Sequence, residues 1–119
     1  DDIYPNLAMD ITLGPLKHDI FNQGKSNIKW QESTRAGALF VASNYGPYKH
    51  LKDKAVLVDE NTTEAWYNAL KQAVEDVEMR KKIIKTAQDD LKANWRLEDN
   101  WERYKLMFEK VREKKYAKD

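Results

Sequence analysis

The hydrophobic positions follow two patterns that divide the chain near residue 60. Up to that point, short apolar runs alternate with turn residues, as in an α/β unit. This pattern predicts strands at residues 11–13, 39–42 and 55–58, the first of them ended by Gly14 and Pro15. The second and third runs are continuously apolar, which favours parallel strands buried on both faces of the sheet.

A polar stretch and a short helix are predicted between the first two strands. Residues 17–25 show no apolar period and are interpreted as a loop. Ser26 and Asn27 offer an N-cap for a helix over residues 27–36, which contain no helix breaker. Gly37 is placed to end this helix, because glycine adopts the left-handed conformation without steric cost.

From residue 61 onward the spacing becomes helical. Thr62 or Thr63 can cap the first helix, and Glu64 suits the positive end of its dipole. Three apolar stripes then predict three helices, or two with a bend near Trp95. The stripes are Trp66, Leu70, Val74 and Val77, then Ile84, Ala87, Leu91 and Trp95, then Leu97, Trp101, Tyr104, Phe108 and Val111.

These elements predict a single α/β domain over residues 1–119, with a short parallel sheet and a helical C-terminal half. Residues 1–60 form its α/β segment, and residues 61–119 form a helical segment that packs on the sheet. Because a parallel sheet needs cover on both faces, we expect the missing cover upstream of Asp1. The chain is then the back half of a longer domain.

Composition excludes several classes of function. The chain has 119 residues, with 21 Lys and Arg against 20 Asp and Glu, so its net charge of +1 gives no overall attraction toward nucleic acid, an anionic membrane or acidic substrates. The absence of cysteine excludes a disulfide scaffold, a cysteine-ligated zinc and a thiol nucleophile. No apolar run reaches the roughly 18 residues that a membrane span needs.

The candidate chemistry lies where the polar loop enters the first helix. Ligands of open α/β sheets bind outside the carboxyl ends of strands, and free amides at a helix N-terminus hold anions there. Lys25 can add positive charge for a phosphate at this helix entrance. Glu32 lies about one and a half turns further on. A carboxylate at that depth can accept two ribose hydroxyls while the helix end holds the phosphates.

Residues in this region resemble a known family in their order along the chain. They are Asp10-Ile11-Thr12-Leu13-Gly14-Pro15-Leu16, Phe21-Asn22, Lys25-Ser26-Asn27-Ile28-Lys29, Glu32, Gly37, Leu39-Phe40-Val41-Ala42-Ser43, Gly46-Pro47-Tyr48, Val56-Leu57-Val58, Trp66 to Leu70, and Arg80. Over roughly residues 10 to 95 the sequence resembles the C-terminal half of a group 1, family 4-like glycosyltransferase of the GT-B fold.

The resemblance implies a partial Rossmann-like three-layer unit that binds a nucleoside-diphosphate sugar. In the family, two glutamates eight positions apart often flank the donor, and the second binds its ribose. Glu32 matches the second, whereas the first falls on Gly24. The chain fits the family's Phe-Asn-x-x-Lys-Ser variant of this loop. The implied donor-binding residues are therefore Gly24, Lys25, Ser26, Asn27 and Glu32.

The implied activity belongs to a full-length enzyme. It is transfer of a sugar from the donor to a glycan, lipid or protein acceptor, as in polysaccharide biosynthesis, without a cofactor or metal. The family's usual catalytic residue lies in an N-terminal domain, so the 119-residue piece alone is expected to be inactive. The implied location is cytoplasmic, at most peripheral to the inner face of a membrane. The sugar, the base and the acceptor stay open.

Simpler interpretations stand beside these. Spacing alone favours Glu32 as a solvent-facing partner of Lys29 or Arg35. Ser26 and Asn27 serve as plain helix caps, with or without phosphate contacts, and Lys25 is more often a solvated loop lysine. Gly24, with polar residues at positions 31 and 35, motivates a second hypothesis. It is a non-catalytic interaction module that keeps the glycosyltransferase scaffold.

Other features carry weaker hypotheses. His18 and His50 are 32 positions apart, a spacing that does not indicate a metal site. His18 is interpreted as an exposed loop residue in preference to a general base. The helical spacing of the tryptophans favours core or interface residues over a platform on which a carbohydrate stacks. The face formed by residues 97–111 predicts self-association or a detached last helix. A basic tail fits a solvated helix end better than a site for lipid headgroups or RNA; it comprises Lys110, Arg112, Lys114, Lys115 and Lys118.

Overall fold

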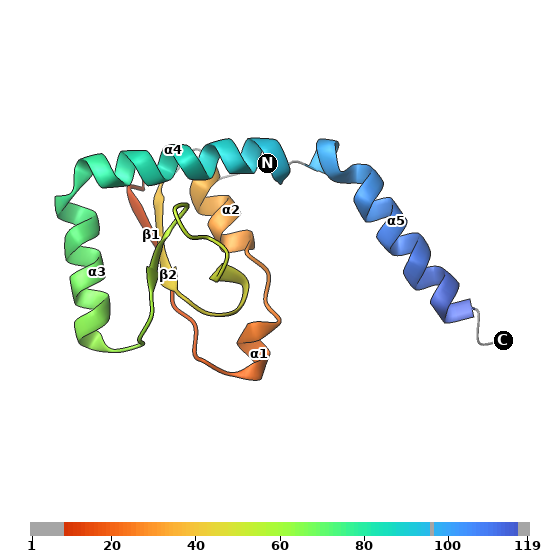
Figure 1. The fold of residues 1–119 in the computed structure, drawn as a ribbon, viewed down its shortest axis with the longest axis horizontal. Helices are drawn as coiled ribbons and strands as arrows, with labels where there is room; N and C mark the ends of the chain where they lie inside the picture. Colours follow the sequence, from red (N-terminus) through yellow and green to blue (C-terminus); the bar gives the residue numbers. More distant parts are fainter. Residues whose placement is uncertain (1–8, 96, 117–119) are drawn as a thin grey trace.

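The computed structural model describes residues 9–95 and 97–116, which form a mixed α/β fold with a short parallel sheet (Figure 1). The sheet and the helical second half agree with the sequence prediction at this level. The elements in chain order are β1 (Ile11–Gly14), α1 (Ile20–Gln23), α2 (Ile28–Arg35), β2 (Leu39–Ser43), the 3-10 turn η2 (Gly46–Tyr48), β3 (Val56–Val58), α3 (Thr63–Glu75), α4 (Val77–Asn94) and α5 (Leu97–Tyr116).

The three strands lie in the order β1-β2-β3, and both pairs are parallel. Ile11 pairs with Leu39 and Val41 with Val56, so the carboxyl ends of all three strands meet at one edge of the sheet. β2 is buried along its whole length, as its apolar run predicts. β3 begins at Val56 and only Val58 is buried, so the predicted strand buried on both faces is instead an edge strand.

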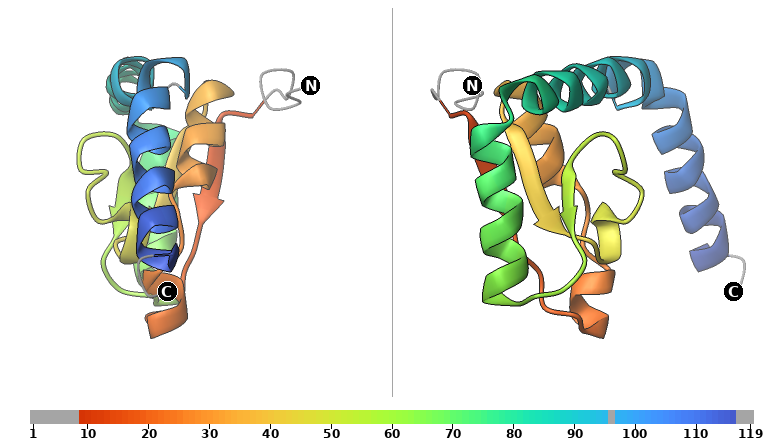
Figure 2. Two further views of the ribbon diagram at one scale, coloured as in Figure 1. Left: turned by 90° about the vertical axis from the view of Figure 1, so that its right-hand side faces the viewer. Right: turned by 60° about the vertical axis from the view of Figure 1, so that its left-hand side comes forward.

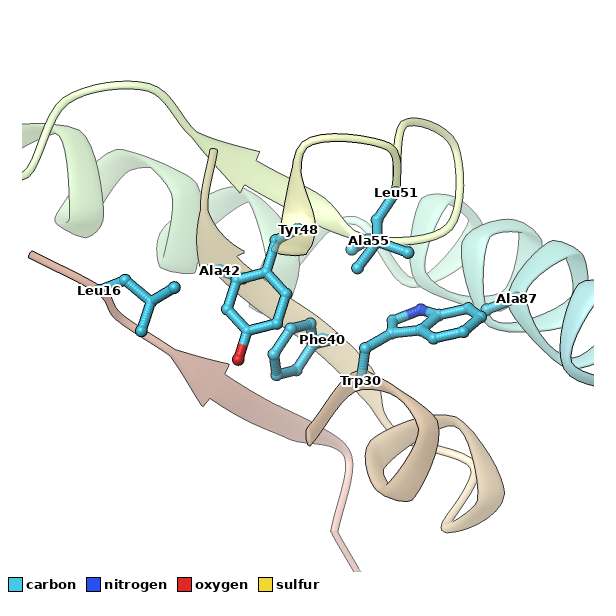
Figure 3. Packing of buried hydrophobic residues seen from close by; sticks show 8 residues of the cluster. All are labelled: Leu16, Trp30, Phe40, Ala42, Tyr48, Leu51, Ala55 and Ala87. Atoms are coloured by element: carbon cyan, nitrogen blue, oxygen red, sulfur yellow. The ribbon is translucent and has the colours of Figure 1, made fainter. Parts of the chain in front are cut away.

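Alternating residues of β2 divide the core into two clusters. Phe40 and Ala42 pack on one face with Trp30 of α2 and with Tyr48, whose ring meets Phe40 edge-on at 5.0 Å (Figure 3). Leu39 and Val41 face the other way and pack against α3. The sheet is therefore covered by α2 and the segment between β2 and β3 on one face, and by α3 on the other.

The helix α4 crosses the amino ends of the strands and contributes to both clusters (Figure 1). Gln88 Nε2 donates to the carbonyl of Thr34 at the end of α2, 3.4 Å away. Gly37 follows with a φ of +76°, the left-handed conformation expected at the end of that helix. This turn directs the chain from α2 into β2 beneath α4.

The break between α3 and α4 falls earlier than the apolar stripe predicted. Thr62 caps α3 through the amide of Ala65, as expected, but α3 ends at Glu75. Asp76 then caps α4 by accepting from the amide of Met79. The first stripe is therefore wrong at its end, because Val74 and Val77 are exposed.

The last helix, α5, extends away from the sheet and its covering helices (Figure 1 and the right view of Figure 2). Phe108 and Val111 from the third predicted stripe are exposed. The side chains of Leu97, Trp101 and Tyr104 lie outside the described residues. Where the chain is described, α5 forms no extended packing with another element.

Candidate functional site

The candidate site lies at the carboxyl edge of the sheet, where three connections meet. The connection after β1 carries α1, the connection after β2 carries η2, and the third leads from β3 into α3. The sequence predicted an unstructured loop over residues 17–25, and this is wrong in part. Residues 20–23 form the single turn α1, which Asp19 caps by accepting from the amide of Asn22 at 2.8 Å.

A closed hydrogen-bond network joins these connections at Ser43, a fully buried residue at the end of β2. The amide of Leu16 donates to Ser43 Oγ at 2.8 Å, and Ser43 Oγ donates to Asn61 Oδ1 at 3.0 Å. Asn61 Nδ2 donates in turn to the carbonyl of Leu16 at 2.6 Å. Both backbone groups of Leu16 are therefore satisfied, and the connection after β1 is fixed to the two other connections.

A second set of contacts fixes α1 against η2. The rings of His18 and Tyr45 stack with centroids 4.4 Å apart, and the Tyr45 hydroxyl donates to the carbonyl of Asp19 at 2.8 Å. Gly46 has a φ of +57° and approaches α1 so closely that a Cβ there would lie 2.7 Å from the carbonyl oxygen of Asn22. His18 is exposed, and in this contact it packs against an aromatic ring.

The N-terminus of α2 opens at the same edge, and its cap differs from the prediction. Asn27 occupies the N-cap position, but its side chain makes no capping hydrogen bond. Its Oδ1 accepts from Gln31 Nε2 at 2.8 Å instead. The predicted side-chain cap from Ser26 or Asn27 is therefore absent, because Gln31 one turn later occupies the acceptor that would have met a backbone amide. The first-turn amides of α2 keep no side-chain cap, and such groups attract anions.

The other predicted donor residues lie close to this helix end in sequence. Gly24 follows α1 as its C-cap and is exposed, like Ser26. Lys25 is also exposed, and its Nζ lies 5.2 Å from the centroid of the Phe21 ring. Four of the five predicted residues, Gly24 to Asn27, thus form the link between α1 and α2.

Glu32 lies further along α2, on the side away from the sheet. It is two residues beyond Trp30, which is fully buried, so its position is turned by about 200° from the core-facing side. Its rise from Asn27 is about 7.5 Å along the helix axis. Glu32 is half-buried, and it can meet a ligand only on the outer side of α2.

One tyrosine near this edge is electrostatically distinct. Burial raises the pKa of the Tyr48 phenol above its ordinary value. Its side chain points into the core between Leu16 and Phe40 rather than out of the sheet edge (Figure 3). Tyr48 therefore stays neutral at physiological pH and serves packing.

Two further observations concern possible ligand sites in the described residues. Within residues 9–95 and 97–116, no group of three or more His, Asp or Glu side chains could hold a metal ion. An open groove of about 690 Å³ lies instead beside β3 and α4, with Ala55, Leu57, Met79 and Ile83 in its lining. None of the predicted donor residues lines that groove.

Sequence reasoning missed the residues that organise the edge. Ser43 is the last residue of β2 and Asn44 follows it, while Asp59 and Asn61 lie one and three residues after the end of β3. Asn44 Nδ2 donates to Asp59 Oδ1 at 2.7 Å, as Ser43 Oγ donates to Asn61 Oδ1. Both hydrogen bonds therefore join the end of β2 to the connection after β3. The available signal was the position of polar side chains immediately after apolar strand runs, where parallel strands bring them together.

Comparisons with known proteins add no assignment, since no family model, curated protein or solved structure matches this chain. Among the described residues, no helix is long and apolar enough to cross a membrane.

Proposed function

We propose that this chain is the donor-binding part of a glycosyltransferase, which moves a sugar from a nucleoside diphosphate to an acceptor hydroxyl. The observation that carries the proposal is the arrangement on α2. This helix offers first-turn amides without a side-chain cap and, five residues further on, the half-buried carboxylate of Glu32. The resemblance of the sequence to group 1 glycosyltransferases supports the same assignment.

The two groups on α2 suit the two chemical parts of a nucleoside diphosphate. The helix N-terminus, with Lys25 beside it in sequence, would hold the diphosphate and stabilise the negative charge that develops when the sugar–oxygen bond breaks. Glu32 would accept hydrogen bonds from two hydroxyls of the ribose. The sugar carbon then forms its new bond to the acceptor oxygen, and the acceptor proton leaves to a base that this chain's described residues do not identify.

Titration of nucleoside diphosphates and nucleoside-diphosphate sugars tests the assignment. In the intact protein, Glu32→Gln should weaken binding by about 1–3 kcal/mol, because the ribose hydroxyls lose their charged acceptor. The matched variant Glu78→Gln removes an exposed glutamate from α4 and should leave binding unchanged. Unchanged affinity in Glu32→Gln would remove the assignment of this residue.

A ligand without ribose hydroxyls separates a direct role of Glu32 from an effect on folding. A 2′,3′-dideoxynucleoside diphosphate should bind wild type and Glu32→Gln equally well, because the hydroxyls that Glu32 recognises are gone. An equal loss of affinity for both ligands in the variant would indicate a disturbed helix instead.

A non-catalytic module is the second candidate. Gly24 stands where the family often has a carboxylate. Gln31 Nε2 donates to the side-chain oxygen of the N-cap residue Asn27. A protein that binds none of the nucleoside-diphosphate sugars in the titration would favour this candidate over the enzyme.

A further inference from the structure

Where its side chains are described, the helix α5 carries an exposed apolar face and forms no extended packing with another element. Met107, Phe108 and Val111 are 54%, 67% and 62% exposed. Successive residues turn by 100°, so these three side chains share an arc of about 100° on the helix surface. The sequence continues the same spacing toward the start of the helix with Tyr104 and Trp101.

The charged residues of α5 are ordered around that apolar face. Lys110 and Lys114 border it on one side, and Lys105 and Arg112 border it on the other, at about 20–60° from its nearest apolar member. All four side chains are exposed. The acidic positions of α5 lie on the opposite side of the helix, about 130–190° from the centre of the apolar face, a side that also carries Leu106, which is 56% exposed; they are Glu98, Asp99, Glu102, Glu109 and Glu113.

We infer that α5 binds the surface of a membrane that contains anionic lipids. A helix lying in the interface needs an apolar side to enter the acyl boundary and basic residues beside it whose long side chains reach the headgroups. The acidic residues of α5 then face the aqueous solution, where they avoid repulsion by the lipids. This inference is independent of the proposed sugar transfer.

The charge order favours lipid over a second copy of the chain. Two α5 helices packed through the same apolar face would bring the basic borders of one copy against those of the other, and like charges at that distance repel. An anionic surface instead attracts both borders at once. Each basic residue near such a surface strengthens binding about fivefold.

Vesicle co-sedimentation of the 119-residue protein tests the inference. Binding is expected to vesicles of phosphatidylcholine mixed with phosphatidylglycerol, and not to phosphatidylcholine alone. Lys105→Gln/Arg112→Gln should weaken it about 25-fold. The control Lys71→Gln/Lys81→Gln removes two exposed lysines from α3 and α4, with the same change of net charge, and should bind as wild type.

The apolar face is tested by Phe108→Gln/Val111→Gln, which should abolish binding to the anionic vesicles. Both positions are exposed, so the thermal unfolding of this variant should match wild type and rule out misfolding as the cause. An absence of binding to the mixed vesicles overturns the inference. An equal loss in the Lys71/Lys81 control overturns it too, because attraction would then follow net charge alone. A concentration-dependent dimer that Phe108→Gln/Val111→Gln dissociates, without vesicle binding, would assign the face to a second copy.

Discussion

The two longest helices, α4 and α5, have 18 and 20 residues and both combine an apolar stripe with many charges, yet only α4 packs against the sheet. Ala87 of α4 is buried, and Ile84 and Leu91 pack against the two core clusters. Phe108 of α5 remains 67% exposed. The difference shows that apolar spacing identifies a helix and its apolar face but does not reveal whether another element packs against that face.

Polar contacts reinforce the same difference. Asp90 of α4 pairs with Lys54 at 3.3 Å and accepts from Trp95 Nε1 at 3.1 Å. Trp95 in turn meets Trp30 edge-on, with ring centroids 6.2 Å apart. The end of α4 is therefore anchored to α2 and to the segment before β3. Substitutions at chemically matched positions inside and outside the packed body can test how far this contrast extends.

Removal of a large aromatic side chain should give the largest contrast. Trp30→Ala should lower the free energy of unfolding by about 3–5 kcal/mol, because it empties the centre of one core cluster. It also leaves the Lys54 carbonyl without the indole donor that lies 3.0 Å away. Phe108→Ala on α5 should change stability by less than about 0.5 kcal/mol. Urea unfolding measures both, and similar losses in the two variants would show that α5 packs in solution.

Removal of one hydroxyl should give the next contrast. Ser43→Ala leaves the amide of Leu16 without its buried acceptor and removes one of the two donors to Asn61 Oδ1, the other being Trp66 Nε1 at 3.3 Å. We expect a loss of about 1–3 kcal/mol in the free energy of unfolding. Ser26→Ala, at an exposed position before α2, should change it by no more than about 0.5 kcal/mol. A Ser43→Ala protein as stable as wild type would mean that the network at the carboxyl edge is dispensable for stability.

A methyl group added to glycine should give a smaller contrast. Gly37 has a φ of +76°, and an alanine there should cost about 1–2 kcal/mol of stability because its Cβ disfavours the left-handed conformation. Gly24 has a φ of −85°, and its nearest neighbouring atom would lie 3.7 Å from a new Cβ. Gly24→Ala should therefore be neutral or slightly stabilising in thermal unfolding. If both variants lost the same stability, the left-handed turn after α2 would be in doubt.

Strands and helices could be predicted where local chemistry dominates. The apolar run of β2, the glycine after α2 and the cap Thr62 each act within a few residues, and all three predictions are confirmed. β3 was predicted as fully buried because an apolar run does not reveal whether a strand lies at the sheet edge. The end of α3 was misplaced because Asp76 can cap a new helix within an uninterrupted apolar period.

The candidate site was harder to predict, because its contacts join residues that are far apart in the sequence. Ser43 meets Leu16 across 27 positions and Asn61 across 18. Only the topology of the parallel sheet brings these residues together. The side chain of Asn27 could have reached a backbone amide or Gln31, and the spacing fits both. Glu32 stays a prediction, since its role depends on a ligand.

The smallest contrast concerns pH and compares Tyr48 in the core with Tyr67, which is 62% exposed on α3. Burial raises the pKa of Tyr48, so the unfolded chain releases this proton at a lower pH than the folded protein does. Above about pH 10, the ordinary value for tyrosine, the folded state therefore binds more protons, and stability falls as the pH rises. This contribution is fully present below pH 10 and is lost as the pH passes through the raised pKa. Tyr48→Phe should make the decline of urea-measured stability at alkaline pH shallower, whereas Tyr67→Phe should leave the slope as in wild type. Equal slopes in wild type and Tyr48→Phe would indicate that the phenol of Tyr48 reaches water in the folded protein.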